Sequence, residues 1–415
     1  MATTSAIIAA ARAFHGEDVG PAISGLLGTL RERPRVLGLG EPTHREDALP
    51  RLRNELFHHL AEHEGYRSIA LESDCLAALT VDAYVTGGED TSDEDSLDDV
   101  MRRGFNHELG EYPANRELVR WMREHNRDLP RERRLRFFGF DAPIEIMGPD
   151  SPRTALAGLY GHLAPHVPAD LLTCTWAEID ELIGDDARWS DPAAAMDPSR
   201  SVGRSAEAVR LRLIADDLAA LLQAQTPHLI SATSREQWWR AALHARTATG
   251  LMRYHASMAD PAQARVGRLM GMRDAMMADN LTAVAHAHGP TLAFAHNRHL
   301  QRELSRWRLA DMDLEWWSAG AIVQERLPGR YAFVATTVGA APHLKLDVPP
   351  PDTLEGLLYG LPDGRHVLDG ARLSAALAGT GLNTRTTDNH GYFPLDPAHL
   401  PGLDGIVFVK DLDPS

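Results

Sequence analysis

The sequence predicts an α/β fold, with a three-layer core built on a mainly parallel sheet and an inserted all-helical subdomain. Apolar runs of strand length recur along the chain and alternate with helical patterns, which is typical of βαβ units. One long stretch contains helical patterns alone. With 415 residues and 44% hydrophobic content, the chain is long enough for a large core carrying an insertion.

The first three predicted strands lie in the N-terminal part of the chain. Residues 36–40 form the first strand, and residues 68–71 form the second after a helix over about 48–62. Residues 135–140 form the third, after a helix that covers 116–127. Ahead of them, residues 1–18 read as an amphipathic helix and not as a signal peptide, because they lack a basic start and a long apolar stretch.

The second group of strands follows a long helical region. Residues 152–288 show helical patterns only, with long Ala/Leu/Arg-rich helices over 206–224 and 235–258. We predict that this region either caps the site as a lid or packs as a structural bundle. Strands over 291–295, 331–337 and 405–409 then complete the sheet, so residues 1–151 and 289–415 form the predicted core.

Two shorter segments have the composition of loops. Residues 86–99 are acidic and rich in turn formers, which predicts a solvated loop that runs into a helix. Residues 349–351 are a proline run, which favours an extended or turn conformation.

Charge and cysteine content exclude several classes of protein. The net charge is −16 and the pI is about 5.6, whereas binding to a nucleic acid backbone needs dense Lys and Arg. The two cysteines, Cys75 and Cys174, provide no disulfide framework. No apolar run is long enough to span a bilayer. We therefore expect a cytoplasmic protein that binds a small molecule and neither nucleic acid nor membrane, in an oligomeric state that the sequence does not specify.

Polar residues follow each of four predicted strands. Because the carboxyl ends of parallel strands share one edge of a sheet, and ligands bind along that edge, these residues are expected to meet in one cleft. They are Glu41 and His44, Glu72 and Asp74, Asp141, and the run His296, Asn297, Arg298 and His299.

His44 is the first candidate for chemistry. A neutral histidine takes a proton from water near pH 7, and a carboxylate such as Glu41 or Glu72 can orient its second nitrogen. His296 and His299 lie at i, i+3, where they can bind an oxyanion, transfer a proton or ligate a metal. The alternative is an ordinary loop histidine, since the chain has 20.

Two more residue types are candidates near His44. Arg53 can reach back from the following helix to clamp a carboxylate or stabilise negative charge, whereas Arg51 is equally well explained as a solvated helix residue. Trp316 and Trp317 can line a pocket, but a core position is the favoured interpretation of both.

Several known motifs are missing from the sequence. It has no Gly-x-Ser-x-Gly elbow, no His-Glu-x-x-His helix and no P-loop. The pair Gly38 and Gly40 lacks the third glycine of the dinucleotide fingerprint. A serine hydrolase and a Rossmann cofactor site are therefore disfavoured, and we predict no cofactor and no bound metal.

Five blocks in order resemble the erythromycin esterase family. These are Gly-Leu-Gly-Glu41-Pro-Thr-His44 with Arg53 and Glu72, the segment Gly139-Phe-Asp141, the helix from Arg273 to Asn280, Ala295-His296-Asn297-Arg298-His299, and the strand after Leu403. The resemblance implies a parallel-sheet core and hydrolysis of an ester or macrolactone by activated water. It places the general base on His44, its support on Glu41 and Arg53, and the later histidine pair on His296 and His299.

The chain departs from the family pattern after the first histidine. Family members usually carry Gly-Thr there and a glutamate four positions on, where this chain has Arg45, Glu46 and Ala48. Arg45 is expected to bind substrate and, if close, to lower the pKa of His44 by charge repulsion. The departure fits an acidic substrate or a biosynthetic intermediate at least as well as a macrolide.

Alternative functions remain open from the sequence. The leading hypothesis is a metal-independent hydrolase of a natural product, in which Glu41 and Glu72 hold the histidines while Arg53 with His296 or His299 stabilises the oxyanion. A biosynthetic family member would use the same base for cyclisation, transesterification or another acid–base rearrangement. A metal-dependent hydrolase and a non-enzymatic binder of a haem-like ligand are the further alternatives.

Overall fold

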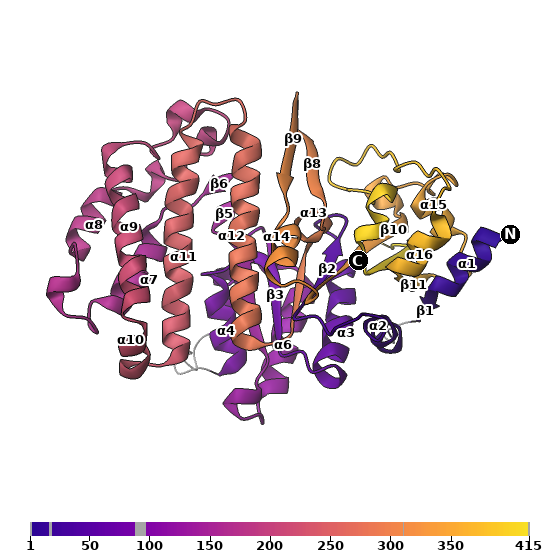
Figure 1. Ribbon diagram of the computed structural model, residues 1–415, viewed down its shortest axis with the longest axis horizontal. Coiled ribbons are helices and arrows are strands. Elements are labelled where there is room, and N and C mark those ends of the chain that lie inside the picture. The colour runs from indigo at the N-terminus through magenta and orange to yellow at the C-terminus, as the bar shows by residue number, and fades with distance from the viewer. Residues whose placement is uncertain (1, 16–18, 88–96, 310, 414–415) are drawn as a thin grey trace.

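A large sheet forms the centre of the protein. The computed structural model describes residues 2–15, 19–87, 97–309 and 311–413, and within them the sheet has eight strands in the order β1-β11-β12-β10-β2-β7-β3-β4 (Figure 1). Strands β12 to β4 in this order run parallel, whereas β1 and β11 pair antiparallel at one edge. The strand bounds are β1 Ala11–Ala13, β2 Val36–Glu41, β3 Ser68–Asp74, β4 Arg136–Asp141, β7 Thr291–His296, β10 Tyr331–Ala340, β11 Arg365–Asp369 and β12 Gly405–Asp411.

The predicted fold class is confirmed as a mixed α/β structure with a mostly parallel sheet. All six predicted strands are present, each within a few residues of its expected bounds. These strands are continuous runs of buried residues, as expected when a parallel sheet is covered on both faces.

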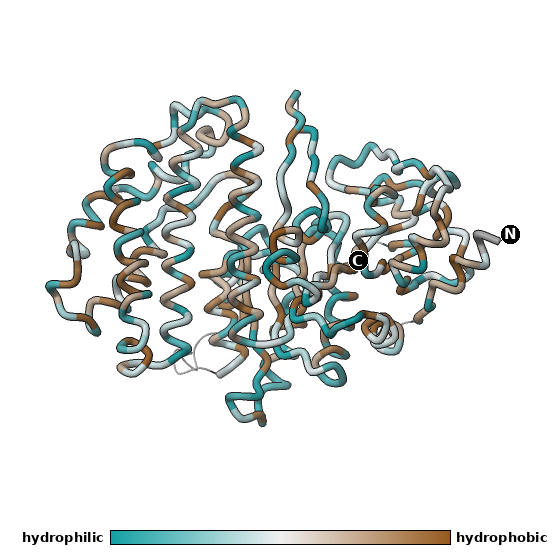
Figure 2. The backbone as a smooth tube through the Cα atoms, in the orientation of Figure 1, coloured by the Kyte–Doolittle hydropathy of each residue, from teal (hydrophilic) through white to brown (hydrophobic). Residues whose placement is uncertain are grey.

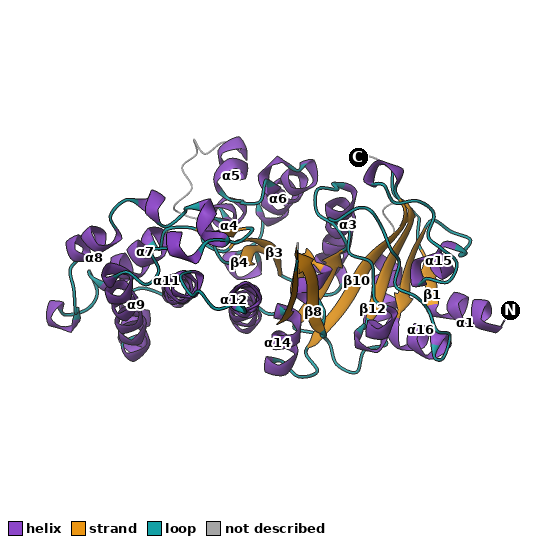
Figure 3. Ribbon diagram, turned by 90° about the horizontal axis from the view of Figure 1, so that it is seen from above, coloured by secondary structure: helices purple, strands orange, loops and turns teal. Residues whose placement is uncertain are grey.

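Helices cover both faces of the sheet and make three layers (Figure 3). Neighbouring residues of a strand point to opposite faces, so Phe137 and Leu292 pack into one apolar cluster while Phe138 and Ala293 pack into the other. The first cluster includes residues of α2 Gly20–Leu27, α3 Ala48–His63, α4 Ala78–Thr86, α5 Leu97–Arg103 and α6 Pro113–Asn126. The second includes residues of α1 Ala2–Ala10, α14 Ala319–Arg326, α15 Leu354–Tyr359 and α16 Gly370–Leu377.

The segment 152–288 contains helices and no strand among its residues, all of which are described. It forms an arm at one end of the molecule (Figure 1), and brown, hydrophobic stretches on α9 mark its internal packing (Figure 2). Its helices are α7 Arg153–Leu163, α8 Trp176–Ile183, α9 Ala206–Ala224, α10 Thr226–Ala232, α11 Arg235–Met258 and α12 Arg265–His288. Helix α12 packs against strands β4, β7 and β9, and α11 reaches β4 through Trp239 against Phe138, while the rest of the arm stands beside the sheet.

Two features of the chain ends differ from the sequence prediction. Residues 1–18 were predicted as one helix, but α1 ends at Ala10 and Ala11–Ala13 forms β1, which pairs with β11; residues 1 and 16–18 lie outside the described residues. The sequence prediction also lacks the short strand β11. This strand has only five residues, and its last residue, Asp369, caps α16, so the hydrophobic pattern is too short to indicate a strand.

A hairpin beside the sheet was likewise missed. Strands β8 Leu304–Leu309 and β9 Met312–Trp317 pair antiparallel and project from the core (Figure 1). Their exposed and buried residues alternate, so Trp316 is buried while Trp317 is 60% exposed. The core position expected for Trp317 is therefore wrong, since successive strand residues face opposite sides.

Smaller expectations have mixed outcomes. Residues 88–96 of the predicted acidic loop lie outside the described residues, and α5 begins after them. The proline run turns into α15, where the Pro350 carbonyl accepts from the Thr353 amide. Both cysteines are free and buried. In the described part of the chain no helix combines the length and apolarity needed to cross a bilayer.

Candidate active site

A cavity of about 620 Å³ opens at the carboxyl ends of the central strands. It lies where β2, β7 and β3 end side by side, with Glu41 directly opposite His296 in the register. The predicted residues that line it are Glu41, His44, Arg45, Arg53, Glu72, His296, Arg298 and His299.

Two glycines allow the strands to end in this arrangement. A Cβ on Gly40 would lie 2.1 Å from Oδ1 of Asn297, so the asparagine packs directly on the β2 backbone. A Cβ on Gly139 would lie 2.4 Å from the Ser73 carbonyl, where the register of β3 against β4 shifts between Leu71 and Asp74. Such a bulge re-aims side chains, and here it carries Glu72 into the cavity.

His44 lies in the turn between β2 and α3 and is held by Glu41. The Nδ1 atom of His44 lies 2.8 Å from Oε1 of Glu41, which turns Nε2 towards Glu72 Oε1 at 4.0 Å. The side chain of His44 is 49% exposed, so the ring borders open space in the cavity. Burial disfavours the charged ring, but Glu72 and then Glu41 outweigh it and raise the pKa of His44.

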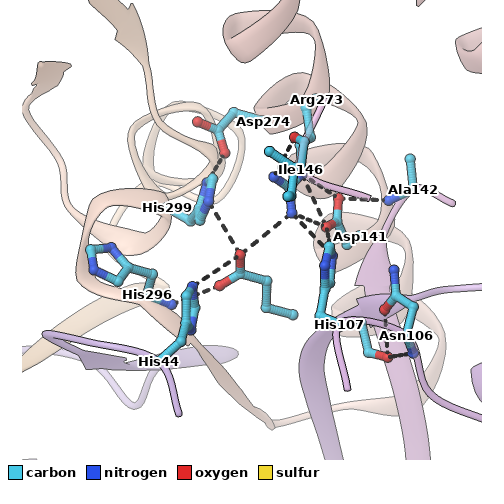
Figure 4. A network of polar contacts seen from close by, with 12 residues as sticks. His44, Asn106, His107, Asp141, Ala142, Ile146, Arg273, Asp274, His296 and His299 are labelled. Carbon is cyan, nitrogen blue, oxygen red and sulfur yellow. Dashed lines mark hydrogen bonds and ion pairs between the residues drawn. The ribbon is translucent and has the colours of Figure 1, made fainter. Parts of the chain in front are cut away.

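Glu72 lies at the centre of a charged network. Its Oε1 atom is 3.3 Å from Nε2 of His299 and 3.5 Å from Nη2 of Arg273, and its Oε2 accepts from the His296 amide at 2.8 Å. Figure 4 shows His44, His299 and Arg273 converging on one point. Burial alone would raise the pKa of this carboxyl, but His299 and His44 hold it well below its usual range.

His299 is held as an imidazolium. Its Nδ1 donates to Oδ1 of Asp274 at 2.5 Å, and its Nε2 faces Glu72 (Figure 4). Burial opposes the charge, but Asp274 and Glu72 raise the pKa of His299 to about 10. The ring is therefore protonated at neutral pH, in contrast to the role of a base.

His296 has both ring nitrogens bonded to the backbone. Nδ1 accepts from the Arg298 amide at 3.2 Å and caps α13 Asn297–Leu300, while Nε2 donates to the Pro42 carbonyl at 3.3 Å. Burial, followed by the nearby His44, lowers the pKa of His296 well below its usual value. The residue borders the cavity as a neutral ring that fixes the turn around the site.

Three arginines predicted at the site have different surroundings. Arg53 is buried, donates to the Asn54 and Asn115 amide oxygens, and has a pKa lowered by burial to about 9. Arg45 is 77% exposed and pairs with Glu108 at 2.9 Å. The expectation that Arg45 lowers the pKa of His44 is wrong, because the carboxylates dominate and raise it.

Arg298 is the third, and its guanidinium lies over the ring of Phe393 at the cavity wall. Arg51 forms ion pairs with Asp47 and Glu117 and does not line the cavity, which matches its interpretation as a solvated helix residue.

Three residues predicted to bind substrate do not line the cavity. Asp74 caps the turn into α4 by accepting from the Leu76 amide at 2.7 Å, and burial raises its pKa to about 6. Asp141 is fully buried and pairs with Arg273. Asn297 clamps the backbone of β10 through Thr336. The polar atoms of each side chain are therefore engaged in contacts within the protein.

Other residues of the site were not predicted from the sequence. Arg273 and Asp274 of α12 contact Glu72 and His299, and the indole of Trp316 donates to Asp274. The available signal was an adjacent Arg–Asp pair on a helix otherwise rich in Ala and Met. His107 also lines the cavity, and its Nδ1 pairs with Glu145 at 2.7 Å.

One wall of the cavity is apolar. It includes residues from three separate elements, namely the turn between β5 Ile144–Glu145 and β6 Gly148–Pro149, helix α12, and the β8–β9 hairpin. The side chains are Ile146, Met147, Met270, Trp307 and Trp316. From the predicted lid segment 152–288, the cavity takes Met270 and Arg273, both on α12. Among the described residues, no group of three or more His, Cys, Asp or Glu side chains is arranged to hold a metal ion.

Comparisons with known proteins place the chain in a family. The erythromycin esterase family model matches residues 61–412, whereas no curated protein sequence matches the chain. A Bacillus cereus protein of known structure has a TM-score of 0.74 at 16% identity, covering 100% of this chain and 98% of its own. A succinoglycan biosynthesis protein gives a TM-score of 0.71 at 16% identity, covering 100% and 97%.

A mutant of the erythromycin esterase EreC in its open conformation gives a TM-score of 0.66 at 18% identity, covering 94% of this chain and 93% of its own. At these identities the structures show a shared fold. The family model matches most of the chain, and on that ground the chain belongs to the erythromycin esterase family.

Proposed function

We propose that this protein is a hydrolase that opens an ester or lactone of a small natural product with water activated by His44. The single observation that carries the proposal is the bond from His44 Nδ1 to Glu41 Oε1 at 2.8 Å, on a ring that stays half exposed to the cavity. A carboxylate bonded to one imidazole nitrogen fixes the tautomer and leaves the other nitrogen to accept a proton.

In the proposed reaction, neutral His44 removes a proton from a water molecule that attacks the carbonyl carbon. The tetrahedral intermediate then collapses, the acyl C–O bond breaks, and protonated His44 returns the proton to the leaving alkoxide oxygen. Before that collapse, negative charge develops on the carbonyl oxygen, and preorganised cations stabilise it. Arg53 and His299 are suited to this role because both border the cavity and both are cationic at neutral pH. His296 is the less suitable of the two later histidines, since its nitrogens bond the backbone.

The test is a His44→Ala variant assayed against a panel of lactones and aryl esters. Removal of a general base is expected to lower kcat roughly 10²- to 10⁴-fold. The circular dichroism spectrum should stay unchanged, because His44 lies in a turn at the cavity and not in the core. Retained turnover in a folded variant would reject His44 as the base.

The same base can also catalyse a biosynthetic rearrangement of the substrate. Analysis of the reaction products distinguishes that rearrangement from hydrolysis. Hydrolysis in ¹⁸O-labelled water is expected to place one solvent oxygen in the carboxylic acid product. A cyclised or transesterified product without label would show instead that a substrate hydroxyl is the nucleophile.

A further inference from the structure

Arg298 carries a charge that the protein leaves uncompensated. Its guanidinium stacks over the ring of Phe393 at 3.9 Å, and its Nη1 atom is buried with no hydrogen-bond partner. Among the described residues it forms no ion pair within 4.0 Å, although it borders the cavity. Burial lowers the pKa of Arg298 to about 10, so the side chain is still a cation at neutral pH.

The other arginines at the cavity have acceptors within the protein. Arg45 pairs with Glu108, Arg273 pairs with Asp141, and Arg53 donates to two asparagine oxygens. A partly buried cation without an acceptor costs free energy unless an anion reaches it. The pattern therefore singles out Arg298 as the cavity arginine available to a ligand.

Arg298 lies one histidine ring away from the proposed base. The ring of His296 is centred 5.2 Å from that of His44 and 4.9 Å from that of Phe393, on which Arg298 stacks. A substrate whose carbonyl reaches His44 can therefore extend along His296 and place a further group at the guanidinium. Arg298 and Phe393 also line a second cavity of about 160 Å³, so the guanidinium separates two open spaces.

The surrounding charge favours an anion with a single negative charge. Glu41 and Glu72 line the same cavity and would repel a dianion more strongly than a monoanion. The planar guanidinium matches the two oxygens of a carboxylate. The apolar wall on α12 and the β8–β9 hairpin suits the hydrocarbon part of such a molecule.

We infer that Arg298 binds a carboxylate of the substrate, which makes the protein selective for esters or lactones of acidic small molecules. This inference rests on the proposed function for the position of the reacting ester. It replaces Arg45 as the residue expected to recognise an acidic substrate, because Arg45 is already paired at the exposed mouth.

The experiment compares two esters of equal length, phenyl hydrogen glutarate and the phenyl ester of glutaric acid monoamide. Wild-type protein is expected to have the higher kcat/KM for the acid. Arg298→Gln should lower the acid-to-amide ratio of kcat/KM roughly 10- to 100-fold, the usual range for a lost charge-assisted hydrogen bond, with Arg298→Lys in between. Arg308→Gln removes the same charge from the exposed hairpin, outside both cavities, and should leave the ratio unchanged.

Calorimetric binding separates this inference from the proposed function. Phenyl hydrogen glutarate should bind His44→Ala at least roughly 10-fold more tightly than His44→Ala/Arg298→Gln, whether or not the ester is hydrolysed. Equal binding would overturn the inference and leave the role of His44 intact, whereas turnover by His44→Ala would reject the proposed function alone. Tighter binding of a phosphate-ended analogue than of the carboxylate would overturn the assignment of a monoanion.

Discussion

At the scale of single residues, Glu72 faces two imidazoles that have different surroundings. Its Oε1 atom faces Nε2 of both His44 and His299. Each imidazole also contacts a second carboxylate, Asp274 at 2.5 Å from His299 and Glu41 at 2.8 Å from His44. The ring of His44 is half exposed, whereas that of His299 is only 14% exposed. Unequal exposure around one carboxylate thus distinguishes the imidazolium of His299 from the His44 ring that we propose as the base.

The pH dependence of activity should report the charge of Glu72. The base is active above the pKa of His44, and Glu72 raises that pKa above its usual 6.5, so activity should rise on an ascending limb centred above pH 6.5. Glu72→Gln removes the negative charge and should move the limb to lower pH. Measured kcat/KM profiles check this, with Glu108→Gln at the cavity mouth as a control whose limb stays in place. An unmoved limb in Glu72→Gln would contradict the assignment.

The two later histidines should respond differently to the same substitution. His296→Asn keeps an oxygen that can cap α13, and should lower kcat/KM by less than about 10-fold. His299→Asn leaves Glu72 and Asp274 without their shared cation, and should lower it by roughly 100-fold or more. Steady-state kinetics of the two variants, each checked for its melting temperature, decide between these roles. The reverse order of effects would assign chemistry to His296.

At the scale of elements, the cavity mouth is built from turns in unusual backbone conformations. The non-glycine residues with left-handed φ at this mouth are Arg45 at 65°, His107 at 54°, Glu108 at 60° and Ile146 at 58°. Ion pairs from Arg45 to Glu108 and from His107 to Glu145 brace these turns against one another. Such conformations cost free energy and are commonly retained at functional sites.

Ile146 gives a direct test of this strain. It is a β-branched residue with φ of 58°, and the residue is 73% exposed, so Ile146→Gly should relieve strain with little loss of burial. The free energy of unfolding in urea is expected to rise by about 1 kcal/mol. Val209→Gly, at an exposed position within α9, should instead lower it by about 0.5 kcal/mol, because glycine has the lower helix propensity. If Ile146→Gly lowers the free energy of unfolding as much as Val209→Gly does, Ile146 is not strained.

At the scale of the whole molecule, the sheet edge and α12 bring residues from Glu41 to Phe393 around one cavity. The surroundings of the histidines lower the pKa of some on folding and raise the pKa of others, so these histidines affect the pH dependence of stability in opposite directions. His255 is buried and His244 and His288 are partly buried away from the cavity, and desolvation lowers the pKa of each to about 4. His299 is buried among carboxylates, and its pKa is raised to about 10.

Global stability should therefore decline on the alkaline side of neutrality. The stabilisation from His299 is complete below its unfolded pKa of 6.5 and is lost progressively towards its folded pKa of about 10. The free energy of unfolding should fall between pH 6.5 and 8.5, with His299 contributing at most about 1.4 kcal/mol per pH unit. Urea titrations across this window check the slope.

His299→Gln supplies the matched measurement. It removes one titrating group, so the free energy of unfolding should decline less steeply between pH 6.5 and 8.5. The remaining decline should come from His44, because the pKa of His44 is also raised. His255→Gln removes a histidine whose linkage acts below pH 6.5 and should leave the alkaline slope unchanged. An identical slope in wild type and His299→Gln would show that the imidazolium is not retained on folding.

The sequence by itself determined the sheet, its main strands and most of the polar residues around the cavity. Buried parallel strands are apolar along their whole length, and parallel strands end at one edge, so Glu41, His44, Glu72 and His299 were expected to meet. The alternation in the β8–β9 hairpin was also readable from the residues, although it was missed.

Only the tertiary structure decided what each polar residue does. A residue type fixes which protons and charges a side chain can carry, but burial and neighbours fix which it does carry. His296 and His299 look equivalent in sequence, yet one bonds two backbone groups and the other two carboxylates. The contacts of Arg298 with Phe393, and of Asp274 with His299, join segments far apart in the chain, and local periodicity carries no record of them.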